Sequence, residues 1–185
     1  MAASRNRRSA GSSPRGFTLI ELLAYLALVG VCLSIGVPAF GGLARDSARE
    51  GQVNLFLQAV HVARSEAIKR NGVVSLCPSL DGSHCSPRRD WATGWLLFVN
   101  LDHDSPAARD ATEPLLRVYQ KWDRGHILSN RDTLSFRAFG QMGVTATVTF
   151  CDDRGSNAAR ALIISQTGRP RTTSRSASGG MLSCT

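Results

Sequence analysis

Residues 15–23 read Arg-Gly-Phe-Thr-Leu-Ile-Glu-Leu-Leu, and they open the apolar run that decides the fold. This run covers residues 17–40, and Glu21 is its only formally charged side chain. About 20 apolar residues in a helix are enough to cross the hydrocarbon core of a bilayer. The stretch therefore predicts an N-terminal helix whose first half, residues 17–40, spans a membrane.

Residues 1–16, which precede this run, have the composition of a targeting segment. They contain four arginines and no acidic residue. Because basic flanks stay on the cytoplasmic side, we expect the bulk of the chain to lie across the membrane from them. The alternative is an ordinary secretory signal peptide followed by a soluble protein. The apolar run is longer than the usual signal core of about 7–15 residues, which disfavours this alternative.

The net charge of the chain is concentrated at its two ends. The 185 residues, which amount to one domain, carry 22 Lys and Arg against 14 Asp and Glu, a formal charge of +8. Residues 1–16 and residues 154–185 contain arginines and no acid, whereas the part between them is close to neutral. A basic surplus points to nucleic acid, anionic lipid or an acidic protein partner.

Glu21 is unusual because a carboxylate inside a membrane span costs roughly 3 kcal/mol and normally has a partner or a function. Gly16, Phe17, Thr18 and Glu21, followed by the apolar run, resemble the type III signal of type IV pilins and of type II secretion pseudopilins. The resemblance implies that a prepilin peptidase cuts between Gly16 and Phe17 and methylates the new terminus. It also implies that Glu21 neutralises the amino group of Phe17 in a neighbouring subunit and so fixes the register of assembly.

Residues 41–71 are amphipathic and continue the helix. Glu66 and Arg70 stand four residues apart in the favourable order, and Asn71-Gly72 is typical of a helix stop. Apolar side chains recur here at spacings of three and four residues: Val53, Phe56, Leu57, Val60, Ala63, Ala67 and Ile68. We expect one helix over residues 17–70, and we expect its second half to pack on a globular head.

Residues 72–185 have the texture of a β-rich head domain. Short β-branched or aromatic runs alternate with Gly, Pro, Asn and Asp. The expected strands are residues 73–77, 95–99, 115–119, 127–128, 133–136, 145–151 and 161–165. No helical pattern of useful length separates them. The predicted fold class is therefore α+β, with one long N-terminal α-helix packed on an antiparallel β-sheet head.

A series of motifs extends the resemblance over nearly the whole mature chain. They are residues 67–71, 74–79, 91–98, 136–140, 150–152 and 167–171. In this order they resemble the GspH/FimT branch of pseudopilins and minor pilins. The resemblance implies a single-pass protein of the bacterial inner membrane with a periplasmic head, which later enters a pilus or pseudopilus. Its implied partners are the membrane, the prepilin peptidase and other pilins or pseudopilins.

The five cysteines divide into one and four. Cys32 lies in the apolar run, where we expect a small buried hydrophobe. The other four lie in a head expected in the oxidising periplasm, where disulfides persist, and four cysteines allow three connectivities. Cys77 and Cys85 enclose a short Pro/Gly loop and most simply pair with each other. Cys151 would then pair with Cys184 and tie down a Ser/Gly-rich tail.

Metal and catalytic sites are the alternatives to these assignments. A zinc site from Cys77, His84, Cys85 and His103 is the rival hypothesis, although its spacing matches no familiar zinc pattern. Residues 100–104 are rich in oxygen ligands but lack the glycine and glutamate of a calcium loop, so we expect a solvated acidic loop. The sequence has no nucleophile elbow, no zinc-protease motif and no phosphate loop. We therefore predict no cofactor, no metal and no enzyme activity.

The stretch after the last expected strand is the candidate DNA-binding motif. Arg169, Arg171 and Arg175 lie in the acid-free region 154–185, and Gly168 favours a tight turn that projects them from a loop or sheet edge. Arginine and hydroxyl side chains are suited to phosphate. This Gly-Arg-x-Arg stretch resembles the feature linked to DNA uptake in FimT-like minor pilins, which implies non-specific contact with the phosphate backbone. No aromatic platform accompanies it in the sequence, which argues against tight single-strand binding.

Three functions follow from these features. The first is a minor pilin that primes or joins a type IV pilus. The second adds DNA binding for natural transformation through the C-terminal arginines, and the competing interpretation of these arginines is that they only solubilise the head or dock on acidic neighbours. The third is a GspH-like pseudopilin at the tip of a type II secretion pseudopilus, with no DNA role. A soluble secreted protein is the remaining alternative.

Overall fold

The computed structural model describes residues 16–87 and 89–185, and the chain divides into two compact units, Met1–Leu43 and Ala44–Thr185. The expected leader lies outside the described residues except for Gly16. Helix α1, Leu19–Arg70, contributes to both units, and each unit is described by itself.

In the first unit, α1 begins at Leu19 because Thr18 caps it. The Thr18 hydroxyl accepts a hydrogen bond from the backbone N–H of Glu21 at 3.3 Å. Every residue from 16 to 35 is exposed. Cys32, which we expected to be buried, is also exposed, because no described residue covers that stretch. By length and composition α1 could cross a membrane, and it is the only such helix among the described residues.

In the second unit, the C-terminal half of α1 buries an apolar stripe against the sheets. The helix ends where the sequence predicts: Asn71 takes a φ of 50°, and the N–H of Gly72 donates to the carbonyl of Ala67 at 3.1 Å. Arg70 and Glu66 form the expected ion pair, with Nε and Oε2 3.0 Å apart. The buried residues of the stripe are Val53, Phe56, Ala59, Val60, Ala63 and Ala67.

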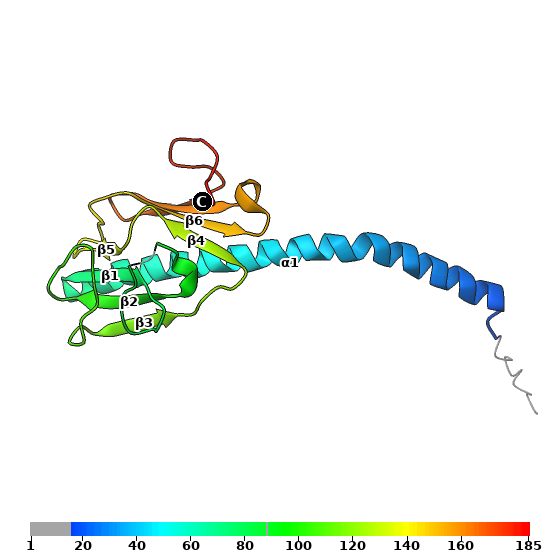
Figure 1. Ribbon diagram of the computed structural model, residues 1–185, viewed down its shortest axis with the longest axis horizontal. Coiled ribbons are helices and arrows are strands. Elements are labelled where there is room, and N and C mark those ends of the chain that lie inside the picture. Colours follow the sequence, from blue (N-terminus) through cyan, green and yellow to red (C-terminus); the bar gives the residue numbers. More distant parts are fainter. Residues whose placement is uncertain (1–15, 88) are drawn as a thin grey trace, which may run out of the picture. The chain divides into compact units, whose positions relative to one another are not determined.

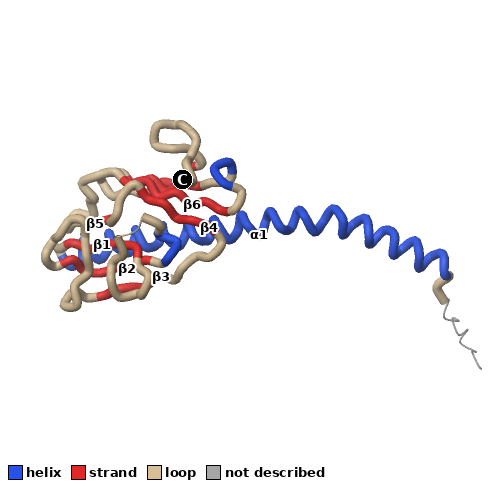
Figure 2. Tube along the Cα trace, in the orientation of Figure 1, coloured by secondary structure: helices blue, strands red, loops and turns tan. Residues whose placement is uncertain are grey.

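In the described part of the chain, eight strands form two antiparallel four-stranded sheets (Figures 1 and 2). The first sheet has the order β3-β2-β1-β5, from β1 (Val73–Pro78), β2 (Trp95–Asn100), β3 (Leu115–Tyr119) and β5 (Leu134–Phe136). The second has the order β4-β6-β7-β8, from β4 (Gly125–Ser129), β6 (Ala146–Asp152), β7 (Arg160–Ile164) and β8 (Pro170–Thr173). Short 3-10 helices occupy Trp91–Thr93 and Gly155–Asn157.

The predicted α+β class is confirmed, and each expected strand is present within one to two residues at either end. Two differences stand out. The strands divide between two sheets instead of one, and β8 was not predicted as a strand. The sequence of β8 is Pro-Arg-Thr-Thr, which has no apolar alternation, so only its pairing with β7 defines it as a strand.

Both sheets meet on the same aromatic ring of α1. The Phe56 centroid lies 5.4 Å from Trp91 and 5.2 Å from Trp95, which precede and begin β2, and 5.9 Å from Phe150 of β6. All four side chains are fully buried. Aromatic pairs at such distances add roughly 1 kcal/mol each beyond the burial of their area. The helix therefore contributes to one core that both sheets share.

Candidate functional site

The C-terminal arginine motif lies on an edge strand. Pro170 is the first residue of β8, a position where its missing N–H does not interrupt a sheet. Arg171 pairs with Ile163 of β7, and Arg169 immediately precedes the strand. Both arginines are exposed. The prediction that they project from a loop or edge therefore agrees with their placement.

The turn before β8 is held by hydrogen bonds within itself. The N–H of Ser165 donates to the carbonyl of Arg169 at 3.0 Å, and the N–H of Arg169 donates to Ser165 Oγ at 3.2 Å. Gly168 donates to the carbonyl of Ser165 at 2.8 Å and has a φ of 72°, which favours glycine. Because the turn is closed in this way, the backbone of Arg169 is fixed relative to the sheet.

The five arginines of residues 154–185 divide into two groups. Arg154 binds Asp46, with Nη2 and Oδ1 2.8 Å apart, and Arg160 binds Glu50, with Nε and Oε1 3.0 Å apart. Arg169, Arg171 and Arg175 form no ion pair with any described residue. The basic surplus at this end is therefore carried by three side chains, not five.

The paired group belongs to a network that fastens α1 to the β6–β7 connection. Arg49 is 2% exposed, and its guanidinium lies 3.3 Å from Asp152 and 2.9 Å from Asp46. Arg154 binds the same two carboxylates. Hydrogen bonding from Arg154, opposed by burial, holds the pKa of Asp152 below its ordinary value. This network is structural, since its charges satisfy one another.

A second loop lies against the arginine turn, a contact that no pattern in the sequence indicates. The N–H groups of Met142 and Gly143 donate to the carbonyl of Gln166 at 3.0 and 3.2 Å. The carbonyl oxygen of Gly140 fills the space that a side chain on Gly168 would need. The sequence shows only that the motif at residues 136–140 ends in a glycine, and in the structure Gly140 takes a φ of 70° in a tight turn.

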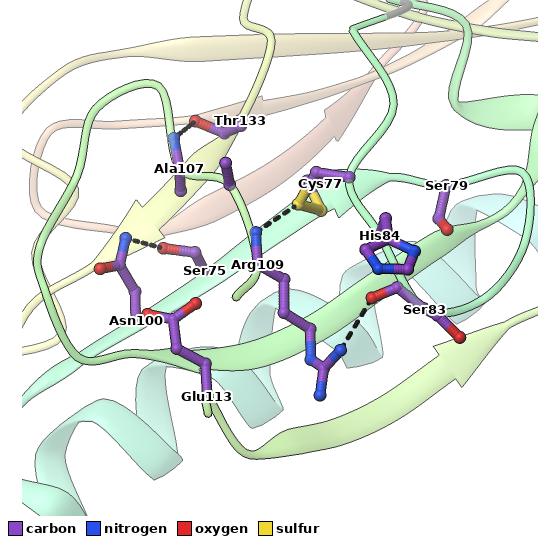
Figure 3. The surroundings of a disulfide bond; sticks show 12 residues. Ser75, Cys77, Ser79, Ser83, His84, Asn100, Ala107, Arg109, Glu113 and Thr133 are labelled. Carbon is purple, nitrogen blue, oxygen red and sulfur yellow. Dashed lines mark hydrogen bonds between the residues drawn. A yellow bond between two sulfur atoms is a disulfide. The ribbon is translucent and has the colours of Figure 1, made fainter. Parts of the chain in front are cut away.

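Two disulfides join the pairs that the sequence favours. Cys77 bonds to Cys85, and Cys151 bonds to Cys184. Cys77 and Cys85 therefore supply no thiolates to the alternative zinc site. Figure 3 shows the first bond, where the N–H of Arg109 donates to Cys85 Sγ at 3.3 Å.

The second disulfide brings the C-terminal tail back to the sheet. Leu182 and Cys184 cluster with Cys151, Ala159 and Ala161. The cluster lies on the outer face of the second sheet, so the tail covers the end of that face away from the arginine turn. Arg171, which pairs with Ile163, thus lies on the same face of the sheet as the covered end.

The acidic loop at residues 100–104 binds its own backbone and side chains. Asn100 is 1% exposed, and its amide donates to Asp104 Oδ1 at 2.9 Å. The nearby Glu113 is also buried and accepts from the N–H groups of Leu101 and Asp110 at 2.7 and 3.0 Å. Among the described residues, no three His, Cys, Asp or Glu side chains gather as metal ligands.

The processing and assembly residues stand at the start of α1. Gly16, Phe17 and Glu21 are all exposed. The Phe17 ring lies edge-on to Tyr25, with centroids 6.2 Å apart. The Glu21 carboxylate has no partner within residues 16–87 and 89–185, and it lies in the first turn, where the helix dipole favours a negative charge.

This combination of a capped apolar helix and a disulfide-bonded β head defines a pilin-like subunit. Comparison with known proteins agrees: residues 12–37 match the prokaryotic N-terminal methylation motif, and residues 52–168 match the type II transport protein GspH model. The chain belongs to the GspH family of pseudopilins and minor pilins.

Two relatives illustrate the match. The pilin-like protein PilA1 of Thermus thermophilus is 31% identical over 169 residues, which cover 85% of this chain and 97% of PilA1. Two crystal structures of the Pseudomonas aeruginosa type IV minor pilin FimU each superpose with a TM-score of 0.53 at 24% identity. They cover 75% of this chain, and 98% and 93% of their own chains, and they show the shared fold.

Proposed function

We propose that this protein is a minor pilin of a type IV pilus that binds DNA for uptake through Arg169, Arg171 and Arg175. In this proposal, prepilin peptidase removes residues 1–16 at the inner membrane, residues 17–40 anchor the periplasmic head, and the processed subunit then enters the pilus. The subunit has a binding role and no enzymatic one.

The DNA proposal depends on which C-terminal arginines have carboxylate partners. Arg154 and Arg160 have carboxylate partners in this chain, whereas Arg169, Arg171 and Arg175 have none among the described residues. Arg171 lies on the edge strand and Arg169 directly precedes it, whereas Arg175 follows the strand and its Nη1 donates to the carbonyl of Gly179 at 3.2 Å. An exposed guanidinium without a carboxylate partner can bind a phosphate in bidentate fashion. Contact with phosphate carries no sequence information, so we expect non-specific binding.

A mobility-shift titration of the processed full-length protein in detergent micelles tests this assignment. We expect Arg169→Ala with Arg171→Ala to remove most duplex DNA binding. The matched control is Arg117→Ala with Arg124→Ala, which removes the same charge from exposed positions on other strands and connections. Equal DNA binding by the two double variants would contradict the proposal that these arginines bind DNA.

The salt dependence of DNA binding measures how many phosphate groups the protein contacts. Three arginine–phosphate contacts on duplex DNA give a slope of about −2 to −3 for log affinity against log salt. Each single arginine-to-alanine change at positions 169, 171 and 175 should make this slope shallower by about 1. A slope that stays the same in all three variants means that the contacts lie elsewhere.

Assembly rests on Phe17 and Glu21. We expect N-terminal sequencing of the mature protein to begin at Phe17, whereas a start at the end of the apolar run, near Ala39, would indicate a secretory signal peptide. Glu21→Gln should be processed normally but should enter filaments poorly, because the neutral side chain cannot balance the new amino group of a neighbouring subunit. Normal incorporation of this variant would remove Glu21 from the assembly contact.

The second candidate function is a pseudopilin of a type II secretion machine. The match to the type II transport protein GspH model favours it, since that family includes such subunits. A pseudopilin of this kind has no DNA role. Deletion of the gene separates the two candidates: loss of secreted protein with normal transformation supports the pseudopilin, and the reverse supports the DNA-binding minor pilin.

A further inference from the structure

Phe139 is the most exposed large apolar side chain in the described part of the chain, at 84% exposure. It stands at the tip of a closed turn, where the N–H of Gly140 donates to the carbonyl of Arg137 at 2.6 Å. The N–H of Arg137 donates in turn to the carbonyl of Gln141 at 2.9 Å. A single exposed apolar residue is normal on a protein surface. A function for Phe139 must therefore be argued from the residues around it.

The turn that carries Phe139 is fastened beside the arginine motif. The carbonyl oxygen of Gly140 lies against Gly168, and it accepts a hydrogen bond from Arg64 Nε at 3.0 Å. Phe139 precedes Gly140 and Arg169 follows Gly168, so standard backbone dimensions place the two Cα atoms at most about 14 Å apart. Two loops that are distant in the sequence thus form one local surface.

This surface is basic as well as aromatic. Arg137 is exposed and forms no ion pair with a described residue, as is also true of Arg169. A groove of about 620 Å³ begins at the same turn, with Arg131 and Arg137 among its lining residues. Its lining also holds two carboxylates, Asp104 and Asp132, of which Asp132 is bound by Arg89 Nε at 2.7 Å. Arg137 and Arg169 thus present guanidinium groups without carboxylate partners among the described residues near an exposed aromatic ring, an arrangement that single-stranded nucleic acid uses.

We infer that Phe139 is a base-stacking residue and that this surface prefers single-stranded or unpaired DNA to closed duplex. The inference rests on the proposed DNA binding and specifies the form of DNA that is bound. Arg137, Arg169 and Arg171 contact phosphates, while the Phe139 ring stacks on a base that no partner strand covers. The sequence-based expectation considered only aromatics within the arginine stretch, whereas Phe139 lies on a different loop.

Charge favours DNA over a neighbouring pilin at this turn. A protein that buried Phe139 would also desolvate Arg137 and Arg169, which have no carboxylate partner in the described chain. Burial of unpaired charges is costly unless the neighbour supplies matching carboxylates. A nucleotide carries its own phosphate next to its base, so it satisfies the ring and the guanidinium together.

Three probes of equal phosphate number test the inference by fluorescence anisotropy with the processed full-length protein in detergent. They are an oligo-dT of about 12 nucleotides, an abasic strand of the same length, and a duplex closed at both ends. We expect Phe139→Ala to weaken oligo-dT binding about 5- to 100-fold and to leave the other two probes within about twofold. Arg169→Ala with Arg171→Ala should weaken all three.

Phe139→Trp is the conservative variant. It should retain oligo-dT affinity, and oligo-dT should quench its added fluorescence while the abasic strand does not. The native Trp91, Trp95 and Trp122 are buried, so they contribute little to this signal.

The outcomes separate the two proposals. If Phe139→Ala leaves oligo-dT binding unchanged, or weakens the abasic strand equally, the stacking role is overturned while arginine-dependent DNA binding stands. If the unaltered protein binds none of the three probes, both proposals fail. If Phe139→Ala blocks entry into pili with unchanged oligo-dT affinity, the ring contacts another pilin instead.

Discussion

The carbonyl oxygen of Gly140 lies in the space that a β-carbon on Gly168 would occupy. Two glycines from different loops thus touch through their backbones, and Arg64 of α1 donates to the same oxygen. This contact places the turn at residues 137–140 beside the arginine motif. The glycine of the Gly-Arg-x-Arg stretch is therefore required by packing as well as by its backbone angle.

Gly168→Ala should destabilise the head by about 2–4 kcal/mol, because the methyl group adds a collision to the cost of a positive φ. Gly155→Ala is the matched control. Gly155 has a φ of 71°, nearly that of Gly168, but open space at its β-carbon position, so we expect a loss of only about 1 kcal/mol. Urea unfolding of both variants measures the difference, and equal losses would show that the contact with Gly140 is unimportant.

Asp152→Asn should lower the free energy of unfolding by about 3 kcal/mol near neutral pH, because it leaves the buried Arg49 without its buried partner. Asp153→Asn is the control, since Asp153 is exposed and its one ion pair with a described residue is to the exposed Arg45. We expect a change below about 0.5 kcal/mol for this control. Similar losses in the two variants would contradict a role for the buried network.

The same network predicts acid sensitivity with a definite sign. Asp152 and Asp46 have folded-state pKa values below the ordinary value for aspartate. The folded state therefore binds fewer protons than the unfolded chain as pH falls below about 4, and stability that is complete above that pH is then lost. Asp152→Asn should flatten the decline of Tm between about pH 4 and pH 2. An unchanged acid profile would assign the sensitivity to other carboxylates.

The two disulfides should differ in their contribution to stability. Cys151–Cys184 closes a loop with a sequence separation of 33, against 8 for Cys77–Cys85. On the chain-entropy model the longer loop contributes about 3–4 kcal/mol and the shorter about 2–3 kcal/mol. Paired Cys→Ala variants, compared by urea unfolding, should show a difference of about 1 kcal/mol in this direction. The reverse order would mean that packing around Cys77 outweighs loop closure.

Residues 44–185 should fold without the rest of the chain. All the described residues that are buried follow residue 43, and both disulfides lie in this unit. We expect the fragment to be soluble, with a Tm within a few degrees of that of the full chain in detergent. A molten fragment with no near-ultraviolet dichroism would show that the N-terminal unit supports the head.

Much of this protein is determined by local sequence. The apolar run and Thr18 determine the start of α1, and Asn71-Gly72 determines its end, because caps and breakers act within a few residues. Most strands follow from short β-branched runs between turn residues. The family also follows from the sequence, since its motifs are ordered along the chain.

The partners of the C-terminal arginines and the surroundings of Phe139 depend on the tertiary structure. From composition alone, the five C-terminal arginines are equivalent. In the structure, Arg154 and Arg160 bind carboxylates of α1 that are about 110 residues away in sequence. Arg169 and Arg171 bind no carboxylate among the described residues. Phe139 joins the arginine motif only because Gly140 packs on Gly168. Ion pairs and surfaces depend on distances in space, which the fold closes over long separations and which neighbouring residues in the sequence cannot reveal.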